Sequence, residues 1–370
     1  MDLRTSIDGC IAGADFATAS RLLQQLWRCE RTSAAAAFVA SRAATLQTHV
    51  PRQPVRIAFL RSFTLEPALP FLQAEAFAAG LEAQAWLGGF NAYAQEIFDP
   101  DSALYRGQPD VIVLAVQTRD LSPLLWTGFS SADPAVVSAE RDRIVTAFRG
   151  WFRALRAHTR ASVIVHDLEC PAWPANGIFD SQAAPGQAAA IQAANAAIGE
   201  AAREERGIYI LGYDGVASRA GRERWFDERK WLQARLPINP ACLMDLVQEW
   251  FRFLHPLTGK VAKAIVFDLD NTIWGGVAGE DGLHGIQLGR EYPGAAFRNM
   301  QQALIDLRQR GILLAVCSKN NPDDAFEIFD RHPEMLLKRE MIAAWRVNWE
   351  PKSKNLREIA AELNIGADAL

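Results

Sequence analysis

Residues 263–272 read Lys-Ala-Ile-Val-Phe-Asp-Leu-Asp-Asn-Thr, and this stretch decides the fold of the second half of the chain. A short apolar run is typical of a buried strand in a parallel sheet, so Asp268 and Asp270 are predicted at the carboxyl end of a strand. Two carboxylates this close repel each other unless a divalent cation or a developing charge offsets the repulsion. The alternative is an ordinary strand end capped by Asp and Thr.

These two aspartates have a specific chemical use. An aspartate can attack phosphorus to form an aspartyl phosphate, and a neighbouring acid can act as general acid and base. We therefore interpret Asp268 as the nucleophile and Asp270 as the group that protonates the leaving oxygen and later deprotonates water. Ser318, after a predicted strand at 312–316, would hold a phosphoryl oxygen, and Lys352, near the start of a helix, would neutralise phosphate charge. Taken alone, Ser318 and Lys352 would be unremarkable surface residues.

Outward from this stretch, predicted strands and helices alternate along the chain, which indicates parallel sheets covered by helices on both faces. The predicted fold class is α/β, with two three-layer parallel-sheet domains and a helical amino-terminal segment. Three parts follow: a helical segment at 1–52, a parallel-sheet domain at 53–256, and a second parallel-sheet domain at 257–370. In the middle part we predict strands at 55–60, 82–87, 110–116, 162–165 and 208–211 and helices at 67–80, 133–158, 183–205 and 240–254.

Composition and charge exclude several classes of protein. The 370 residues are 49% hydrophobic and carry a net charge of −4, which gives no broad attraction to nucleic-acid phosphate. No stretch reaches the roughly 18 apolar residues of a membrane span, and the amino terminus lacks a signal-peptide pattern. We therefore expect a cytoplasmic protein that binds neither nucleic acid nor membrane. Cysteines and histidines are dispersed without the spacing of a zinc site, so any metal should be a hard one.

Polar residues also follow the strands of the first predicted sheet, where ligands of such sheets bind. They are Ser62, Gln117, Arg119, His166 and Asp167. The segment 219–240 combines arginines and a lysine with Trp225, Phe226 and Trp231. Two interpretations of this segment stay open: a solvated linker with amphipathic cover, or a docking face for an acidic partner.

Longer motifs around Asp268 resemble one family. The order of DxDxT, Ser318 and Lys352 matches the first three motifs of the haloacid dehalogenase superfamily. Within it, the sequence resembles the FkbH-like glyceryl transferases over nearly all of residues 261–366. The motifs that carry this resemblance are Asp-Leu-Asp-Asn-Thr-Ile-Trp-Gly-Gly at 268–276, Gly-Glu-Asp-Gly at 279–282, Gly-Ile-Gln-Leu-Gly at 285–289, Cys-Ser-Lys-Asn-Asn at 317–321 and Asn-Trp-Glu-Pro-Lys-Ser-Lys-Asn at 348–355.

The resemblance implies an activity, a cofactor and a partner. Members of this family take a glyceryl unit from 1,3-bisphosphoglycerate, remove its remaining phosphate and place it on an acyl carrier protein for polyketide assembly. The implied cofactor is Mg²⁺, held by Asp268 and Asp270. Besides the catalytic Asp268, Asp270, Cys317 and Lys352, the implied substrate-binding residues are Thr272, Trp274, Gly275, Gly276, Ser318, Lys319 and Asn320.

The implied transfer needs a thiol, because an acyl phosphate must become a thioester before it reaches a phosphopantetheine arm. Cys317 is the candidate, since it lies beside Ser318 and its thiolate could attack the acyl phosphate with help from Lys319 or magnesium. The alternative is a buried core cysteine whose side chain, by strand parity, points away from the substrate. Asp268 would then attack the distal phosphoryl group.

The resemblance also implies a flap over the site at 273–292. There Glu280, Asp281 and His284 would shape selectivity, or would simply be hairpin-turn residues. The superfamily's fourth motif, an acidic pair that completes the magnesium site, is not reached before Leu370. We therefore expect the sequence to be a fragment of a longer protein.

The amino-terminal domain is similar to SGNH hydrolases at Ser62-Phe63-Thr64 and Thr118-Arg119-Asp120-Leu121. It lacks a GDS block around Ser62, the asparagine where Gln117 stands, and a late DxxH motif, so we expect a binding or structural role rather than a serine triad. Two alternatives to glyceryl transfer stay open. One is a phosphatase that needs Asp268 and Asp270 but no thiol, and the other is a carrier-protein docking module without chemistry.

Overall fold

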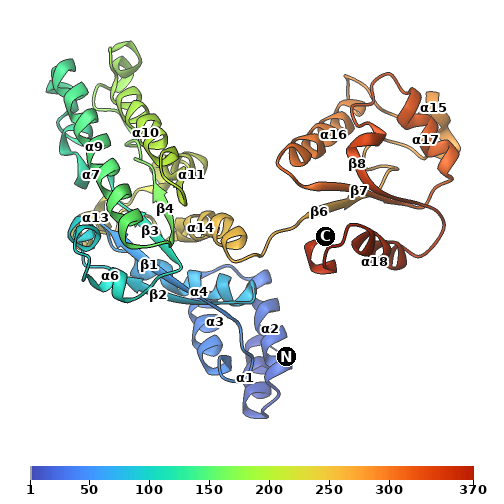
Figure 1. Ribbon diagram of the computed structural model, residues 1–370, viewed down its shortest axis with the longest axis horizontal. Coiled ribbons are helices and arrows are strands. Elements are labelled where there is room, and N and C mark those ends of the chain that lie inside the picture. The colour runs from blue at the N-terminus through green and yellow to red at the C-terminus, as the bar shows by residue number, and fades with distance from the viewer. Residues whose placement is uncertain (1) are drawn as a thin grey trace. The chain divides into compact units, whose positions relative to one another are not determined.

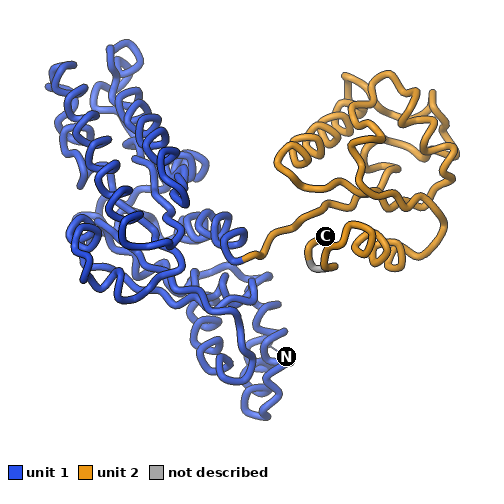
Figure 2. Tube along the Cα trace, viewed as in Figure 1, with its two compact units in different colours: residues 1–258 blue, residues 259–370 orange. Residues whose placement is uncertain are grey.

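The structure is a computed structural model that describes residues 2–370, except for the side chain of residue 368. It divides into two compact units, residues 1–258 and 259–370, which are coloured separately in Figure 2. Each unit has its own parallel sheet (Figure 1). The predicted α/β class with two parallel-sheet regions and a helical amino-terminal segment is confirmed. No helix within residues 2–370 is both long enough and apolar enough to span a lipid bilayer.

The amino-terminal segment forms three helices, α1 (Leu3–Ala12), α2 (Phe16–Cys29) and α3 (Ser33–Leu46). Each begins at a side-chain cap, because Asp2, Asp15 and Thr32 accept backbone N–H groups of the first turns. The apolar stripe of α2 turns inward, and its buried members share one hydrophobic cluster with the first sheet. This segment therefore packs as part of the first unit.

The first sheet has five parallel strands in the order β2-β1-β3-β4-β5. The strands are β1 (Gln53–Arg61), β2 (Leu81–Leu87), β3 (Val111–Ala115), β4 (Ser162–His166) and β5 (Ile208–Leu211). Alternate residues of β1 face opposite sides: Ile57 and Phe59 join the cluster with the amino-terminal helices, whereas Ala58 and Leu60 join the other core cluster. All five strands were predicted within about two residues of their ends.

Helices cover both faces of this sheet. Buried residues of α4 (Leu69–Ala78) and α14 (Leu243–Leu257) lie in the first cluster, and those of α9 (Pro134–His158) and α10 (Gln187–Arg203) lie in the second. The predicted start of α10 at 183 is wrong. The Asp180 carboxylate accepts the N–H groups of Gln187 and Ala188 and so fixes the first turn four residues later.

The second unit has a three-stranded parallel sheet in the order β6-β7-β8. Its strands are β6 (Ala264–Phe267), β7 (Leu313–Ser318) and β8 (Ile342–Val347), and its helices are α15 (Ala278–Gly285), α16 (Gly294–Gln309), α17 (Pro322–Arg331) and α18 (Lys352–Glu362). In β7, Leu314 and Val316 face one core cluster while Ala315 and Cys317 face the other. The polar motifs therefore follow the carboxyl ends of adjacent strands.

Candidate active site

Asp268 directly follows β6 and lies beside the first residue of α18. Its Oδ2 accepts from Lys352 Nζ at 2.5 Å, and its Oδ1 accepts from the N–H of Leu269 at 2.9 Å. Burial by itself raises the pKa of the Asp268 carboxyl, but hydrogen bonds from Lys352, Ser318 and Leu269 outweigh burial and hold that pKa below its usual range. About a third of the side chain, 35%, stays exposed. Asp268 is thus an ionised, accessible carboxylate.

Asp270 is held by three N–H donors. Its Oδ1 accepts from Trp274 Nε1 at 2.9 Å and from the Ala278 N–H at 3.1 Å, and its Oδ2 accepts from Asn320 Nδ2 at 2.9 Å. Asn320 had been assigned to substrate, and the structure also shows it positioning Asp270. The contacts with Trp274 and Ala278 could not be read from the sequence, because they depend on how the chain turns back after Asn271.

The turn after Asp270 is a tight loop. Asn271 has φ of 53°, and its Oδ1 accepts the N–H of Gly276 at 3.0 Å. Gly276 has φ of 97°, and a Cβ there would lie 2.6 Å from Asp281 Oδ2, so only glycine fits without strain. Gly275 is buried and pairs with Gln287 through two backbone hydrogen bonds. The two glycines therefore shape the loop that carries the donors to Asp270.

Thr272 and Trp274 have supporting positions. The Thr272 hydroxyl donates to the Asp270 main-chain oxygen at 3.4 Å, and Trp274 is fully buried in the core cluster of the second unit. Both had been assigned to substrate binding. Their contacts place them as supports for Asp270.

The loop after β7 brings the second predicted motif to the same place. Ser318 is buried, and its hydroxyl contributes a hydrogen bond to Asp268 and accepts from Asn320 Nδ2 at 3.3 Å. Lys319 is exposed and has no ion-pair partner among residues 2–370. Asp268, Asp270, Ser318, Asn320 and Lys352 thus come together, and Lys319 remains available at the edge of the group.

Cys317 lies on the opposite side of β7 from Ser318. Its thiol is 4% exposed and packs in the cluster that contains Ala344 and Ile359. Burial raises the pKa of this thiol, while the Lys352 charge and a hydrogen bond with Asn355 pull in the opposite direction. The structure thus places Cys317 near Lys352 but within a core cluster.

The predicted flap at 273–292 is closed by the antiparallel bridge between Gly275 and Gln287. The expected hairpin turn at Glu280, Asp281 and His284 is wrong, because these residues belong to α15. The Asp281 carboxylate accepts the Val277 N–H at 2.8 Å, which anchors the start of that helix. Glu280 and His284 are exposed on it.

The oxygen atoms of Asp268 and Asp270 are the candidate donors for a hard divalent cation. No group of three or more His, Cys, Asp or Glu side chains suited to a metal occurs in the described part of the chain. A cation here would therefore complete its shell with water and phosphate oxygens, which is how Mg²⁺ is usually bound. The donor set fits that ion.

We expect Lys352→Met to lower kcat/KM for phosphoryl transfer about 10²-fold, the usual cost of one lost charge-stabilising donor. The substitution removes the cation that contacts Asp268 at 2.5 Å and that would meet phosphate charge. Steady-state kinetics would measure the loss. Lys354→Met is the matched control, since Lys354 lies on the same helix and its one ion pair among the described residues is with Glu350. Equal rates in the two variants would contradict a role for Lys352.

In the first unit, the residues predicted at the sheet rim do not form a hydrolytic triad. Ser62 is fully buried, its Oγ accepts the Gln117 N–H at 2.9 Å, and its hydroxyl is hydrogen-bonded to Asp120. His166 Nε2 accepts from Trp250 Nε1 at 2.9 Å instead, and burial lowers the pKa of this imidazole to about 3. These contacts agree with the expected binding or structural role.

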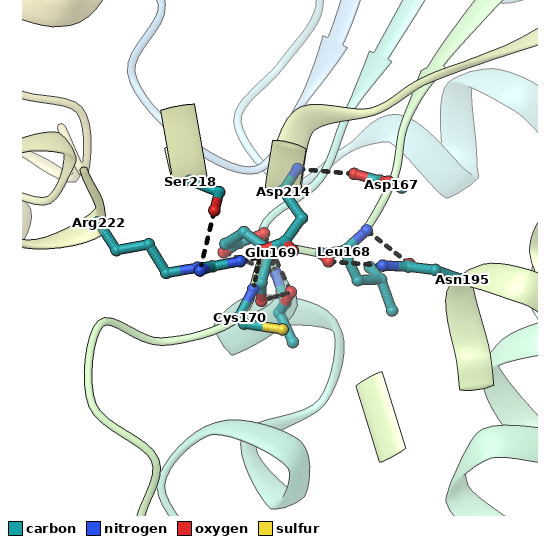
Figure 3. Close-up of polar contacts among 9 residues, drawn as sticks. Asp167, Leu168, Glu169, Cys170, Asn195, Asp214, Ser218 and Arg222 are labelled. Atoms are coloured by element: carbon teal, nitrogen blue, oxygen red, sulfur yellow. Dashed lines mark hydrogen bonds and ion pairs between the residues drawn. The ribbon is translucent and has the colours of Figure 1, made fainter. Parts of the chain in front are cut away.

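Carboxylates after β4 tie neighbouring strand ends together (Figure 3). Asp167 accepts the Asp214 N–H at 2.8 Å, and Asp214 accepts the Cys170 N–H at 2.8 Å and pairs with Arg222 at 2.7 Å. Glu169, two residues after Asp167, is fully buried. The loop after β4 is thereby joined to the helix that follows β5.

Glu169 links the same loop to the chain after β3. Both of its carboxylate oxygens lie 3.1 Å from the Thr118 N, and Oε2 lies 3.0 Å from Thr118 Oγ1. The Thr118 hydroxyl donates its hydrogen to the main-chain oxygen of Glu169 at 2.8 Å. Thr118 Oγ1 is therefore left as an acceptor for the Glu169 side chain, and a protonated Glu169 carboxyl would donate to it. Burial, acting against several hydrogen bonds, raises the pKa of Glu169 to about 8.

The raised pKa of Glu169 predicts how the stability of the fold changes with pH. The folded chain keeps the Glu169 proton up to about pH 8, whereas the unfolded chain releases it above the ordinary value of 4.5. The free energy of unfolding should therefore fall as pH rises between these values. In Glu169→Gln the amide donates to Thr118 Oγ1 at every pH, so we expect a higher melting temperature than wild type at pH 8.5 and a small difference at pH 5. Thermal denaturation at both pH values measures this. A variant less stable at pH 8.5 would contradict it.

Comparison with solved structures finds a similar chain in the N-terminal part of the protein BF1531 from Bacteroides fragilis, which contains a phosphatase domain and was crystallised in complex with Mg. The identity is 27%, the match covers 88% of this chain and 85% of that one, and the TM-score is 0.76. The lipase Lip_vut3 from a goat rumen metagenome matches 54% of this chain and 96% of its own at 12% identity, with a TM-score of 0.40. No family model and no curated protein matches the chain. The chain therefore shares its α/β fold with a protein part that contains a phosphatase domain.

Proposed function

We propose that the second unit transfers phosphoryl groups as a phosphatase of the haloacid dehalogenase type, with Asp268 as its nucleophile. The observation that carries this proposal is the convergence of an accessible Asp268 carboxylate, a Lys352 ammonium group 2.5 Å away and a second carboxylate fixed by three donors. The similarity to a Mg-complexed phosphatase-containing protein part supports it.

In the proposed reaction, an Asp268 oxygen attacks phosphorus and the bond from phosphorus to the leaving oxygen breaks. Asp270 gives its proton to that oxygen. Water then attacks the aspartyl phosphate, Asp270 takes the water proton, and the bond between phosphorus and Asp268 breaks to release phosphate. Ser318 and Lys352 bind the phosphoryl oxygens in both steps.

Asp268 and Asp270 would hold Mg²⁺ in this site. The bound ion supplies charge neutralisation for the phosphoryl oxygens and for the attacking carboxylate. The residues present fit such an ion, because they offer oxygen ligands and leave positions for water and substrate.

The finer proposal is that the phosphoryl group belongs to a glyceryl unit derived from 1,3-bisphosphoglycerate, which passes to an acyl carrier protein. The Cys317 thiolate would attack the acyl carbon, and the bond from that carbon to the phosphate oxygen would break to give a thioester and inorganic phosphate. Asp268 would then remove the remaining phosphoryl group, and the carrier's pantetheine thiol would take the glyceryl unit from Cys317. The resemblance of residues 268–276 and 317–321 to motifs of glyceryl transferases supports this order, and so does the position of the thiol near Lys352 and Asn355.

A specific observation favours a second candidate. Cys317 is 4% exposed in a core cluster, so a phosphatase that never uses the thiol fits its burial better. The two candidates share Asp268 and Asp270 and differ only at the thiol.

Intact-mass analysis of the full chain with 1,3-bisphosphoglycerate, Mg²⁺ and a holo acyl carrier protein tests the proposal. Glyceryl transfer predicts a glyceryl adduct on the carrier, no adduct with Cys317→Ala, and a phosphoglyceryl thioester that accumulates on Asp268→Asn. Release of phosphate with an unloaded carrier, unchanged in Cys317→Ala, would instead establish the phosphatase alone.

A further inference from the structure

The basic, aromatic segment 219–240 folds back onto the carboxyl end of the first sheet. Arg119, after β3, forms two hydrogen bonds with Glu228 at 2.8 and 3.1 Å, and its guanidinium lies 4.5 Å from the rings of both Trp126 and Trp231. The Thr64 hydroxyl donates to the Ala234 oxygen at 2.6 Å. Because several anchors fix it, the segment is a rigid part of the first unit and not a solvated linker.

The outer side of this segment carries more positive than negative charge. Two of its three acids are ion-paired, Asp227 with Lys230 and Glu228 with Arg119, whereas Glu223 accepts a hydrogen bond from the uncharged Trp173 indole and keeps its negative charge. By contrast, three of its arginines are exposed and have no ion-pair partner among residues 2–370. These are Arg224, Arg229 and Arg235.

Large apolar side chains are also exposed on this segment and on the loop after β4. Leu232, between Arg229 and Arg235 in the sequence, is 77% exposed, and the loop presents Trp173 at 73%, Ile178 at 87% and Phe179 at 69%. Exposed apolar groups rimmed by charge are typical of protein-binding surfaces.

The loop that carries these side chains is attached to the basic segment. The Trp173 indole N–H donates to Glu223 at 3.0 Å. At the start of α10, which follows this loop, Gln187 donates to the main-chain oxygen of Trp126 at 2.9 Å, and the Trp126 ring lies 5.7 Å from Phe226. We define the docking patch as Trp173, Ile178, Phe179, Leu232, Arg224, Arg229 and Arg235.

We propose that the docking patch binds an acidic carrier protein, an inference that rests on the proposed function for the identity of the partner. The excess of exposed arginines over unpaired acids favours a negatively charged surface, and the apolar side chains need an apolar centre in that surface. A second copy of this chain is a poor occupant, since two-fold pairing would set arginine against arginine.

The test uses the full chain and a fluorescently labelled holo acyl carrier protein of net negative charge. Fluorescence anisotropy should give a Kd that rises with salt, and the triple variant Arg224→Glu, Arg229→Glu and Arg235→Glu should raise Kd at least about tenfold. Ile178→Ser and Leu232→Ser should each weaken binding without unfolding the chain, because both side chains are exposed. Formation of the Asp268 phosphoenzyme should be unchanged in every variant.

The matched control reverses three exposed arginines near the amino ends of the strands: Arg153 in the last two turns of α9, Arg160 before β4 and Arg206 before β5. This control has the same net charge as the triple variant and should keep wild-type Kd. Equal weakening in both variants, or no carrier binding by the wild type, overturns the docking patch. Binding that depends on the patch without any glyceryl loading would retain the docking patch and overturn glyceryl transfer.

Discussion

Replacement of Asp268 by Asn is expected to remove phosphoryl transfer almost completely, by at least about 10⁴-fold in kcat. An amide cannot form the covalent bond to phosphorus that the carboxylate forms. The change is nearly isosteric, and the Asn oxygen can still accept from Lys352, so the fold should survive. Mass spectrometry after acid quench should show a phosphorylated chain for wild type and none for the variant.

The matched control for this prediction is Asp323→Asn. Asp323 is an exposed acid on α17 with no ion-pair partner in the described part of the chain. Its replacement should leave turnover and phosphoenzyme formation unchanged. Turnover retained in Asp268→Asn would mean that the nucleophile lies elsewhere.

Replacement of Asp270 by Asn is expected to lower kcat by about 10²- to 10⁴-fold, the usual contribution of a general acid and base. The Asn oxygen can accept from Trp274 and Ala278 as Asp270 does. The new NH₂ group then faces Asn320 Nδ2, but Asn320 can turn its amide over and present its oxygen. We therefore expect only a small change in melting temperature.

The dependence on the leaving group distinguishes this role from simple misfolding. Alkyl phosphates need a proton on the departing oxygen, whereas aryl phosphates with acidic leaving groups do not. The loss in Asp270→Asn should therefore be larger for an alkyl phosphate than for p-nitrophenyl phosphate. The same loss for both substrates would contradict a role as general acid.

Several features of the fold and site were predictable because they depend on local sequence. Short, largely apolar segments that alternate with helical ones predicted all five strands of the first sheet, and Pro322 correctly marked the start of α17. Residues that follow parallel strands meet at one edge of the sheet, so Asp268 and Ser318 were expected together. Lys352 was likewise expected near the start of a helix.

Other features were missed because they depend on which distant residues pack together. The helix α15 replaced an expected hairpin turn, since Asp281 caps Val277 and the Gly275–Gln287 bridge closes the loop around it. The start of α10 moved because Asp180 caps it from an adjacent loop.

By itself, the sequence determined that two apolar strands are followed by acidic and hydroxyl side chains of the kinds used in phosphoryl transfer. It could do so because apolar periodicity and residue type are local properties. Only the tertiary structure decided that Trp274, Ala278 and Asn320 hold Asp270, that Cys317 packs in a core cluster, and that Ser62 contacts Asp120 rather than an imidazole. Those contacts join residues from separate strand ends and turns. Their geometry is set by how helices pack against the sheets and by which buried polar groups must find partners there.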